Sequence, residues 1–329
     1  MDKNVKSGYK KYLASMHGKL NTPDDVIRKV VKEGVGDLVS KKRIIAGEVS
    51  EVYNITLENK KHVVLRISRS SRPSFLQEKW ATEQVKKLGV PVPEILLIKY
   101  LTVGDQELSF CLMEKAEGKS LERGGINFES LPEATRKSYI LQAGEILSKI
   151  HSIETLGFGW IIGEGKAEHN TADEVIDDLL KRKERIYEVA DAQKFDRRLV
   201  DKALDIVDRF RERYSHLNPR LNHSDYGHKH FMVKKGKIVA VLDWGGVRSD
   251  SPIYDFANWD YWYGHYIPTN WLKEGYQNKQ LFDENFEDTL HVMRIMKGVE
   301  VADWYESQNY REAVEKALAK LTDDLNYFK

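Results

Sequence analysis

The sequence predicts a mixed α/β (α+β) chain in two parts, a sheet-rich N-terminal part and a larger helical part. Its 329 residues exceed what one small core usually holds. Short runs rich in Val, Ile and Tyr lie before residue 114, whereas long amphipathic helical patterns follow Gly118. A hydrophobic content of 41% supplies enough apolar side chains for packed cores and excludes disorder of the whole chain.

The N-terminal part reads as one helix followed by an antiparallel meander. Thr22, Pro23 and two aspartates predict a helix start, and Gly34 predicts its end. Strands are predicted over 43–46, 52–57, 62–67, 94–100 and 106–113, with a helix over 74–88. Short strands joined by tight turns favour antiparallel pairing.

The second part is predicted to be helical, with one interruption. Helical patterns cover 132–151 and 172–214, short extended segments follow over 220–242, and a second helical block runs from Tyr254 onward. The predicted order is therefore sheet, helices, small sheet, helices.

Charge and cysteine content narrow the function classes. The 52 basic and 51 acidic residues nearly cancel, so no one-signed field attracts nucleic acid or an anionic membrane. Cys111 is the single cysteine, which excludes an internal disulfide and a cysteine-based zinc cluster. With no apolar stretch of 18 residues and no signal-peptide pattern, we expect a cytoplasmic protein without nucleic-acid or membrane partners.

The residues that indicate chemistry lie in the segment 221–255, LNHSDYGHKHFMVKKGKIVAVLDWGGVRSDSPIYD. Asp225 precedes a loop that ends at His230, a predicted hairpin follows, and Asp243 comes directly after the hairpin. Phosphoryl transfer needs a carboxylate that deprotonates the attacking hydroxyl and oxygen ligands that hold Mg²⁺ against nucleotide phosphates. A hairpin that folds back would bring Asp225 and Asp243 into one cleft.

This segment resembles the aminoglycoside phosphotransferase family, a branch of the protein-kinase-like fold. The family's catalytic loop reads His-x-Asp, four residues, Asn, and its metal-binding Asp follows a β-hairpin. The likeness continues through Ser251, Pro252 and Asp255. It implies a bilobal fold with an N-lobe over 1–113, a hinge over 114–118 and a C-lobe over 119–329.

The resemblance also implies roles for individual residues in the catalytic segment. Asp225 falls on the catalytic base and Asp243 on the magnesium ligand. His223 and Asp255 fall on positions that support the loop through hydrogen bonds. His230 stands where most members have Asn, and because Mg²⁺ prefers oxygen ligands, His230 would assist through a water molecule or a phosphate.

A nucleotide site is implied by the same resemblance, which covers most of the chain in order. Ser50 lies in the likeness of the nucleotide-positioning loop, and Arg66 in the strand whose basic residue contacts the phosphates. Glu78 falls on the helical acid that pairs with that basic residue, although an amphipathic helix alone would place it in solvent. Backbone groups of Glu114 and Ala116 would bind the purine of ATP or GTP.

The acceptor class follows from likeness within the family. Leu156-Gly157-Phe158-Gly159 and the start of the catalytic loop resemble hygromycin B phosphotransferases, so an aminoglycoside is the expected substrate. His230 favours macrolide phosphotransferases, which stay the second expectation. In the aromatic run 259–266, core packing explains one helix face. The other face could offer rings to the sugar faces of such a substrate, with Asp260 as a candidate contact for its ammonium groups.

Two other function classes stay open. The absent Asn and the arginine at position 66 are compatible with a nucleotide-binding pseudokinase, although both Asp225 and Asp243 are retained. A zinc hydrolase is the weaker alternative, with His223, His228 and His230 as ligands.

Overall fold

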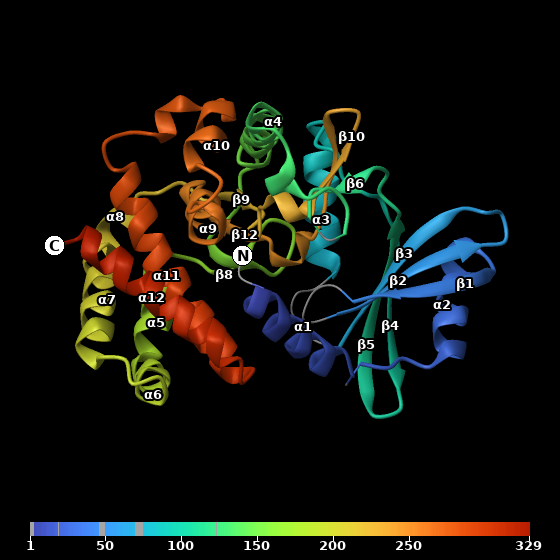
Figure 1. The fold of residues 1–329 in the computed structure, drawn as a ribbon, viewed down its shortest axis with the longest axis horizontal. Coiled ribbons are helices and arrows are strands. Elements are labelled where there is room, and N and C mark those ends of the chain that lie inside the picture. The colour runs from blue at the N-terminus through green and yellow to red at the C-terminus, as the bar shows by residue number, and fades with distance from the viewer. Residues whose placement is uncertain (1–2, 19, 46–49, 70–74, 123) are drawn as a thin grey trace. The chain divides into compact units, whose positions relative to one another are not determined.

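The computed structural model describes residues 3–18, 20–45, 50–69, 75–122 and 124–329 (Figure 1). The chain forms two compact units. The first contains Met1–Ser130 and Lys229–Gly245, and the second contains Leu131–His228 and Gly246–Lys329. The segment that follows the candidate catalytic loop thus belongs to the N-terminal unit, whereas the sequence-based division assigns all of 119–329 to a C-lobe.

The first unit is built on a five-stranded antiparallel sheet of order β1-β2-β3-β5-β4. Its strands are β1 (Leu38–Ile44), β2 (Ser50–Leu57), β3 (His62–Ser68), β4 (Ile95–Val103) and β5 (Gln106–Glu114), and its helices are α1 (Lys3–Gly18), α2 (Asp24–Val35) and α3 (Phe75–Lys87). A small sheet of order β11-β10-β6 joins β6 (Lys119–Ser120) to the hairpin of β10 (Phe231–Lys234) and β11 (Lys237–Val241).

Different helices pack on the two faces of the large sheet, α2 on one face and α3 on the other. Alternate residues of a strand point to opposite faces. Leu65 and Ile67 of β3 pack in one core with Ile27 of α2, whereas Val64 belongs to the core that contains Phe75 of α3. This alternation places the side chain of residue 66 on the α3 side of the sheet.

The second unit is largely helical. Its helices are α4 (Glu133–Ile150), α5 (Ala172–Lys181), α6 (Lys183–Ala192), α7 (Arg197–Arg209), α8 (Arg211–Ser215), α9 (Ile253–Tyr263), α10 (Thr269–Gly275), α11 (Phe286–Ser307) and α12 (Arg311–Tyr327). A four-stranded antiparallel sheet of order β8-β7-β12-β9 lies among them, with β7 (Phe158–Ile161), β8 (Ala167–His169), β9 (Arg220–Asn222) and β12 (Arg248–Asp250).

Some element boundaries differ from the sequence-based expectation. The segment 172–214 forms four helices, with breaks at Arg182, around Lys194 and at Phe210. Lys194 has a φ of 56°, a left-handed conformation that ends a helix. The first strand begins at Leu38 rather than at residue 43, because the exposed, lysine-rich start of an edge strand lacks the apolar alternation by which a strand is identified.

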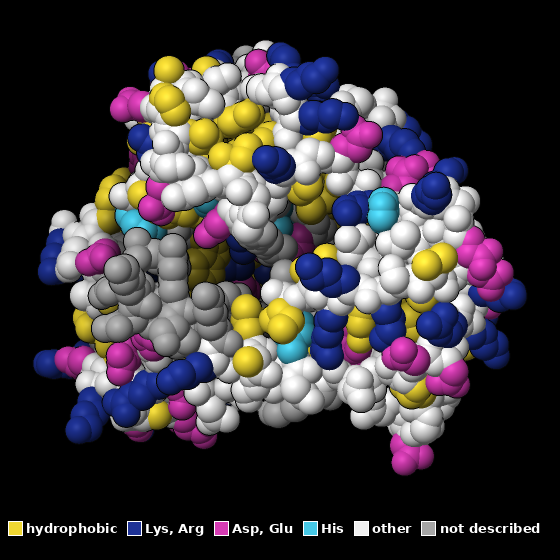
Figure 2. Space-filling model, turned by 45° about the vertical axis from the view of Figure 1, so that its right-hand side comes forward, with side chains coloured by type: hydrophobic (Ala, Val, Ile, Leu, Met, Phe, Trp, Pro, Cys, Tyr) yellow, Lys and Arg dark blue, Asp and Glu magenta, His cyan; other side chains and the backbone are white. Residues whose placement is uncertain are grey.

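The surface in Figure 2 carries Lys and Arg side chains interspersed with Asp and Glu. This mixture agrees with the formal net charge of +1 and leaves no extended basic face in this view. Within the described residues, every helix is too short or too polar to cross a bilayer.

Candidate active site

The loop that carries Asp225 follows β9 and is held through its backbone. The N–H groups of His223 and Ser224 donate to the two carboxylate oxygens of Asp255, at 2.8 and 2.7 Å. Asp255 lies in the first turn of α9 and is fully buried. Ser224 has a φ of 61°, a left-handed conformation that is strained for a residue with a Cβ. The Asp255 carboxylate therefore stabilises a strained turn directly before Asp225.

Three further contacts hold this loop within the second unit. The Tyr226 hydroxyl donates to the carbonyl oxygen of Ala143 in α4 at 2.8 Å. The Ser224 hydroxyl donates to the carbonyl oxygen of Gly246. Gly227 lies against the Tyr263 ring so closely that a Cβ atom would overlap the ring. The Asp225 residue itself is only partly buried, so the loop that these contacts hold leaves part of this residue accessible to solvent.

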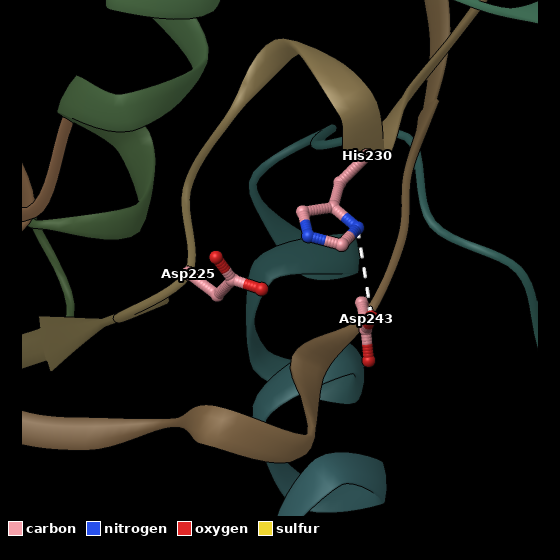
Figure 3. Close-up of side chains that lie close together, drawn as sticks. All are labelled: Asp225, His230 and Asp243. Atoms are coloured by element: carbon pink, nitrogen blue, oxygen red, sulfur yellow. Dashed lines mark ion pairs between the residues drawn. The ribbon is translucent and has the colours of Figure 1, made fainter. Parts of the chain in front are cut away.

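His230 and Asp243 lie together in the first unit. The His230 carbonyl accepts from the N–H of Leu242 at 3.0 Å, which closes the hairpin between them. The His230 Nδ1 atom lies 3.6 Å from Oδ2 of Asp243. Figure 3 shows the imidazole directed toward Asp243, and the loop that leads back along the chain to Asp225. The Cα atoms of Asp225 and His230 can be at most about 18 Å apart, because His230 is only five positions further along the chain.

Arg66 connects Asp243 to α3. Its Nη1 atom lies 2.5 Å from Oε1 of Glu78, and its Nη2 atom lies 3.6 Å from Oδ1 of Asp243. Burial alone would lower the pKa of the Arg66 guanidinium, but the negative charges of Glu78 and Asp243 outweigh burial and hold that pKa above its ordinary value. The Phe75 ring lies 5.3 Å from the guanidinium carbon. Arg66 is thus a fixed cation with one arm on the helix and one toward Asp243.

The donor set of the first unit fits a magnesium ion bound together with nucleotide phosphates. Mg²⁺ commonly takes one or two protein carboxylates and completes its shell with phosphate oxygens and water. Asp243 offers such a carboxylate, and 35% of its side chain is exposed. Its φ of 68° is a left-handed conformation, which aspartate adopts more readily than most residues that carry a Cβ. The nitrogen of the buried His230 is a poorer ligand for this ion.

The predicted hinge follows β5 in the first unit. The N–H of Glu114 donates to the carbonyl oxygen of Glu94 at 2.9 Å, which ties the end of β5 to the segment before β4. Among the residues that the structure describes, the Ala116 N–H has no hydrogen-bond partner. Ser50 is buried at the start of β2. Residues 47–49 of the predicted nucleotide-positioning loop lie outside the described residues.

The carboxylate of Asp260, the candidate substrate contact, is already paired within the second unit. Its carboxylate accepts from Arg294 of α11 and from the Thr269 hydroxyl. Nearly all of α9 is buried, including Phe256 and Tyr263, which lie on the same face of the helix as Asp260. An ammonium group would have to displace Arg294 to reach Asp260, so this role stays a prediction.

Two of the three histidines considered as zinc ligands, His223 and His228, lie among aromatic side chains. His228 is buried, with its ring edge-on to Tyr263 at 5.0 Å and to Tyr266 at 5.9 Å between centroids. His223 is buried beside the Tyr226 ring. Both histidines thus pack within the aromatic core that supports the loop.

Two residues that connect to the Asp225 loop through Asp255, His151 and Tyr276, were not identified from the sequence. His151 follows α4, and its Nε2 atom lies 3.1 Å from Oδ2 of Asp255. Its Nδ1 atom lies 3.1 Å from the hydroxyl of Tyr276. His151 and Asp255 are 104 positions apart, and the sequence pattern gives only an amphipathic helix before His151.

The sequence is similar to known phosphotransferases. The phosphotransferase enzyme family matches residues 42–277. Hygromycin-B 4-O-kinase of Escherichia coli is 22% identical over 242 residues, which cover 70% of this chain and 63% of that protein. The chain therefore spans less than two thirds of this relative.

Solved structures show the same fold. The crystal structure of aminoglycoside phosphotransferase APH(4)-Ia matches with a TM-score of 0.72 and 18% identity, over 92% of this chain and 99% of that one. A ternary complex of a thermostable APH(4)-Ia mutant with AMP-PNP and hygromycin B matches with a TM-score of 0.72 and 19% identity, over 91% and 98%. The structure of the GDP and kanamycin complex of APH(2")-IIia matches with a TM-score of 0.61 and 15% identity, over 91% of this chain and 98% of that one.

These similarities confirm the kinase-like fold and the family resemblance that the segment 221–255 indicates. The family match extends from β1 to the residues after α10 and covers most of the chain. The chain belongs to the phosphotransferase enzyme family.

Proposed function

We propose that this protein is a kinase that transfers the γ-phosphate of ATP or GTP to a hydroxyl group of an aminoglycoside antibiotic of the hygromycin type, and so confers resistance. The observation that carries the proposal is the chain of contacts Glu78–Arg66–Asp243, an ion-pair series that suits a phosphate site. Family membership and the similarity to a hygromycin-B 4-O-kinase support the choice of reaction and acceptor.

In this proposal Asp225 is the catalytic base. Its carboxylate orients the acceptor hydroxyl and takes the proton as the hydroxyl oxygen attacks the γ-phosphorus. The bond between the γ-phosphorus and the bridging oxygen breaks, and the nucleoside diphosphate leaves with that electron pair. The strained turn at Ser224, held by Asp255, fixes the base before substrate arrives.

The phosphate-binding residues come from the first unit. Arg66, oriented by Glu78, donates to phosphate oxygens, and Ser50 lies at the end of the loop proposed to cover them. Backbone groups of Glu114 and Ala116 bind the purine edge. Asp243, assisted by His230, would hold Mg²⁺, which when bound neutralises the charge that develops on the transferred phosphoryl group. Because the donor is ATP or GTP, we place this activity in the cytoplasm.

The direct test measures nucleoside diphosphate release by the purified protein with ATP or GTP and Mg²⁺. The acceptors are hygromycin B, kanamycin, a macrolide and none. We expect stimulation by hygromycin B. Stimulation by the macrolide alone would transfer the assignment to the macrolide phosphotransferases, which His230 favours. Nucleotide binding without turnover on any acceptor would favour a pseudokinase.

The role of Asp225 is tested by Asp225→Asn. The amide cannot accept the proton, so kcat should fall by about 10²- to 10⁴-fold while nucleotide affinity stays the same. Asp196→Asn is the matched control, because Asp196 caps α7 at the surface and an asparagine oxygen can replace it. An Asp225→Asn variant as active as this control would overturn the assignment of the base.

A further inference from the structure

A buried carboxylate, that of Glu51, lies next to the proposed phosphate-binding residues in the first unit. Glu51 is the second residue of β2, follows Ser50 directly and is completely buried. Because alternate residues of a strand point to opposite faces, Glu51 shares its face with Tyr53, which packs in one core with Ile27 of α2. The side chain of Arg66 lies on the other face. The sheet therefore separates Glu51 from a nucleotide held by Arg66.

Four hydrogen-bond donors surround this carboxylate. Its Oε1 atom accepts from the Thr22 hydroxyl at 2.7 Å and lies 2.7 Å from Nη1 of Arg69. Its Oε2 atom accepts from the Tyr53 hydroxyl at 2.6 Å and from the Thr22 N–H at 3.3 Å. Burial alone would raise the pKa of Glu51, but these donors outweigh burial and hold that pKa below its ordinary value. Glu51 is thus a buried anion held by four donors.

The donors come from three parts of the chain, so one carboxylate holds these parts together. Thr22 lies between α1 and α2, Tyr53 lies on β2, and Arg69 directly follows β3. Arg69 also donates to the Gln106 side chain at the start of β5 at 3.1 Å and to the Thr22 hydroxyl at 3.3 Å. We call Thr22, Glu51, Tyr53 and Arg69 the Glu51 cluster. Thr22 precedes the residues that match the phosphotransferase family, so the cluster extends beyond the matched part of the chain.

The strand register connects the cluster to the phosphate-binding residues. Glu51 pairs with Ile67, and Val52 pairs with Arg66, across β2 and β3. Ser50 precedes Glu51 in one strand, and Arg66 precedes Ile67 in the other. A shift of β2 against β3 at this point would change the separation of Ser50 and Arg66, and with it the two proposed contacts to the nucleotide phosphates.

We propose that Glu51 is a positioning residue, which couples Thr22 and Arg69 to the nucleotide site by holding the start of β2 against the end of β3. Glu51 does not touch the nucleotide in this proposal. Coupling between two parts of a protein is reciprocal, so bound nucleotide should strengthen the hydrogen bonds of the cluster by the factor by which the cluster strengthens nucleotide binding. The inference rests on the nucleotide site of the proposed function, but not on any acceptor.

The variants are Glu51→Gln and Thr22→Val, and the probes are ADP and GDP, each with Mg²⁺. Glu51→Gln loses the charge, and its amide nitrogen cannot accept from the donors that remain, so the Kd should rise about five- to thirtyfold. Thr22→Val removes one hydroxyl at nearly constant shape and should raise the Kd about two- to tenfold. This smaller change provides the test if Glu51→Gln does not fold. With hygromycin B as acceptor, kcat at saturating nucleotide should change less than about twofold in both variants, since neither alters the base.

Val30→Ala is the matched control. Val30 of α2 is completely buried in the core that Tyr53 joins, and it is not one of the four donors around Glu51. Truncation of a buried valine leaves a cavity and lowers stability. We expect Val30→Ala to lower the melting temperature at least as much as Thr22→Val, while the Kd stays at the wild-type value.

Hydrogen exchange of the Thr22 amide gives the second measurement. This N–H donates to Glu51, so its exchange reports on the cluster directly. Saturating nucleotide should slow the exchange at least about fivefold in the wild type, and should have no effect on it in Glu51→Gln. The amide of Lys60, in the turn at the other end of β2, should exchange at the same rate with and without nucleotide.

Three results would each overturn the positioning role of Glu51. They are an unchanged Kd in both variants, an equal rise of the Kd in Val30→Ala, and exchange at Thr22 that ignores the nucleotide. The expected rise of the Kd in a protein that phosphorylates no aminoglycoside would uphold the coupling and refute the proposed function instead. A wild-type protein that binds neither ADP nor GDP would overturn both.

Discussion

At the scale of single residues, the proposed nucleotide site depends on the forked guanidinium group of Arg66. Arg66 directs one nitrogen to Glu78 and the other to Asp243, and a planar group can do both at once. A lysine ammonium is a single point on a flexible stem. We therefore expect the arginine at this position to serve in place of the lysine of protein kinases.

Arg66→Lys should weaken nucleotide binding about tenfold, because one charge-assisted contact is lost while the charge remains. Titration calorimetry with ATP or GTP measures this. Arg43→Lys is the control, since Arg43 lies on the same sheet and donates to the carbonyl oxygens of His17 and Leu20. Equal affinity of Arg66→Lys and Arg43→Lys would show that the fork does not serve the nucleotide.

His230→Asn tests the metal preference. An imidazole nitrogen suits Mn²⁺ better than Mg²⁺, and an amide oxygen suits both. We expect the parent to turn over faster with Mn²⁺ than with Mg²⁺, and the variant to lose that preference. Steady-state rates with each ion at saturating nucleotide measure the ratio. No manganese preference in the parent, with near-normal magnesium activity in the variant, would contradict a role of His230 toward the metal.

At the same scale, sequence reasoning reached the residues that local spacing defines. Asp225, His230 and Asp243 lie within one segment, so a loop followed by a hairpin could be identified from neighbours in the chain. His151 and Tyr276 could not be identified in that way. Their relation to Asp255 exists only after α4 and α10 have packed, and neither helix pattern contains that information.

At the scale of elements, strand alternation explains the placement of Arg66, the proposed phosphate-binding residue. Two residues of β3, Leu65 and Ile67, face α2, so Arg66 faces α3 and can meet Glu78. The family resemblance implied the pair of Arg66 and Glu78, whereas the face of the sheet on which Arg66 lies became known only from the structure. The helix start at Thr22 is a different case: α2 begins at Asp24 with Pro23 at the N-cap position, so Thr22 lies one residue too early to cap it, and its hydroxyl donates to Glu51 at 2.7 Å.

The loop element itself is tested at Gly227. Gly227→Ala would place a Cβ atom into the Tyr263 ring, which cannot turn away because Trp259 packs against it at 5.3 Å between centroids. We expect kcat to fall by about a hundredfold as the loop shifts, with a loss of about 1–3 kcal/mol of stability. Gly163→Ala, at a position with open space, is the control. A Gly227→Ala variant with the activity of the control would mean that the loop tolerates displacement.

At the scale of the whole molecule, the path of the chain is what composition could not show. The change from strands to helices near 114–118 marks a difference in content. The compact first unit nevertheless runs to Ser130 and takes up residues 229–245, because the hairpin β10–β11 pairs with β6. Pairing between segments so distant in sequence leaves no local signal in either one.

The stability of the whole chain should also respond to pH through Asp250. This carboxyl group is buried, and burial raises its pKa to about 6, although Arg248 and the Tyr214 hydroxyl oppose the shift. A raised pKa means that the folded state binds the proton more tightly than the unfolded state. Between about pH 4 and pH 6 the unfolded chain has released this proton and the folded chain has not, so unfolding becomes easier as the pH rises.

Asp250→Asn removes this titration. From pH 4 to pH 7 the wild type should therefore lose about 3 kcal/mol of unfolding free energy relative to Asp250→Asn, the equivalent of a shift of about two pKa units. Urea unfolding at a series of pH values measures the difference. The comparison of wild type with Asp196→Asn should show the opposite trend. Arg198 lowers the pKa of Asp196, so the contribution of this carboxylate to the unfolding free energy is present at neutral pH and is lost as the pH falls. If the difference between wild type and Asp250→Asn were the same at pH 4 and pH 7, the buried carboxyl group would have to be ionised throughout, with Arg248 as the dominant neighbour rather than burial.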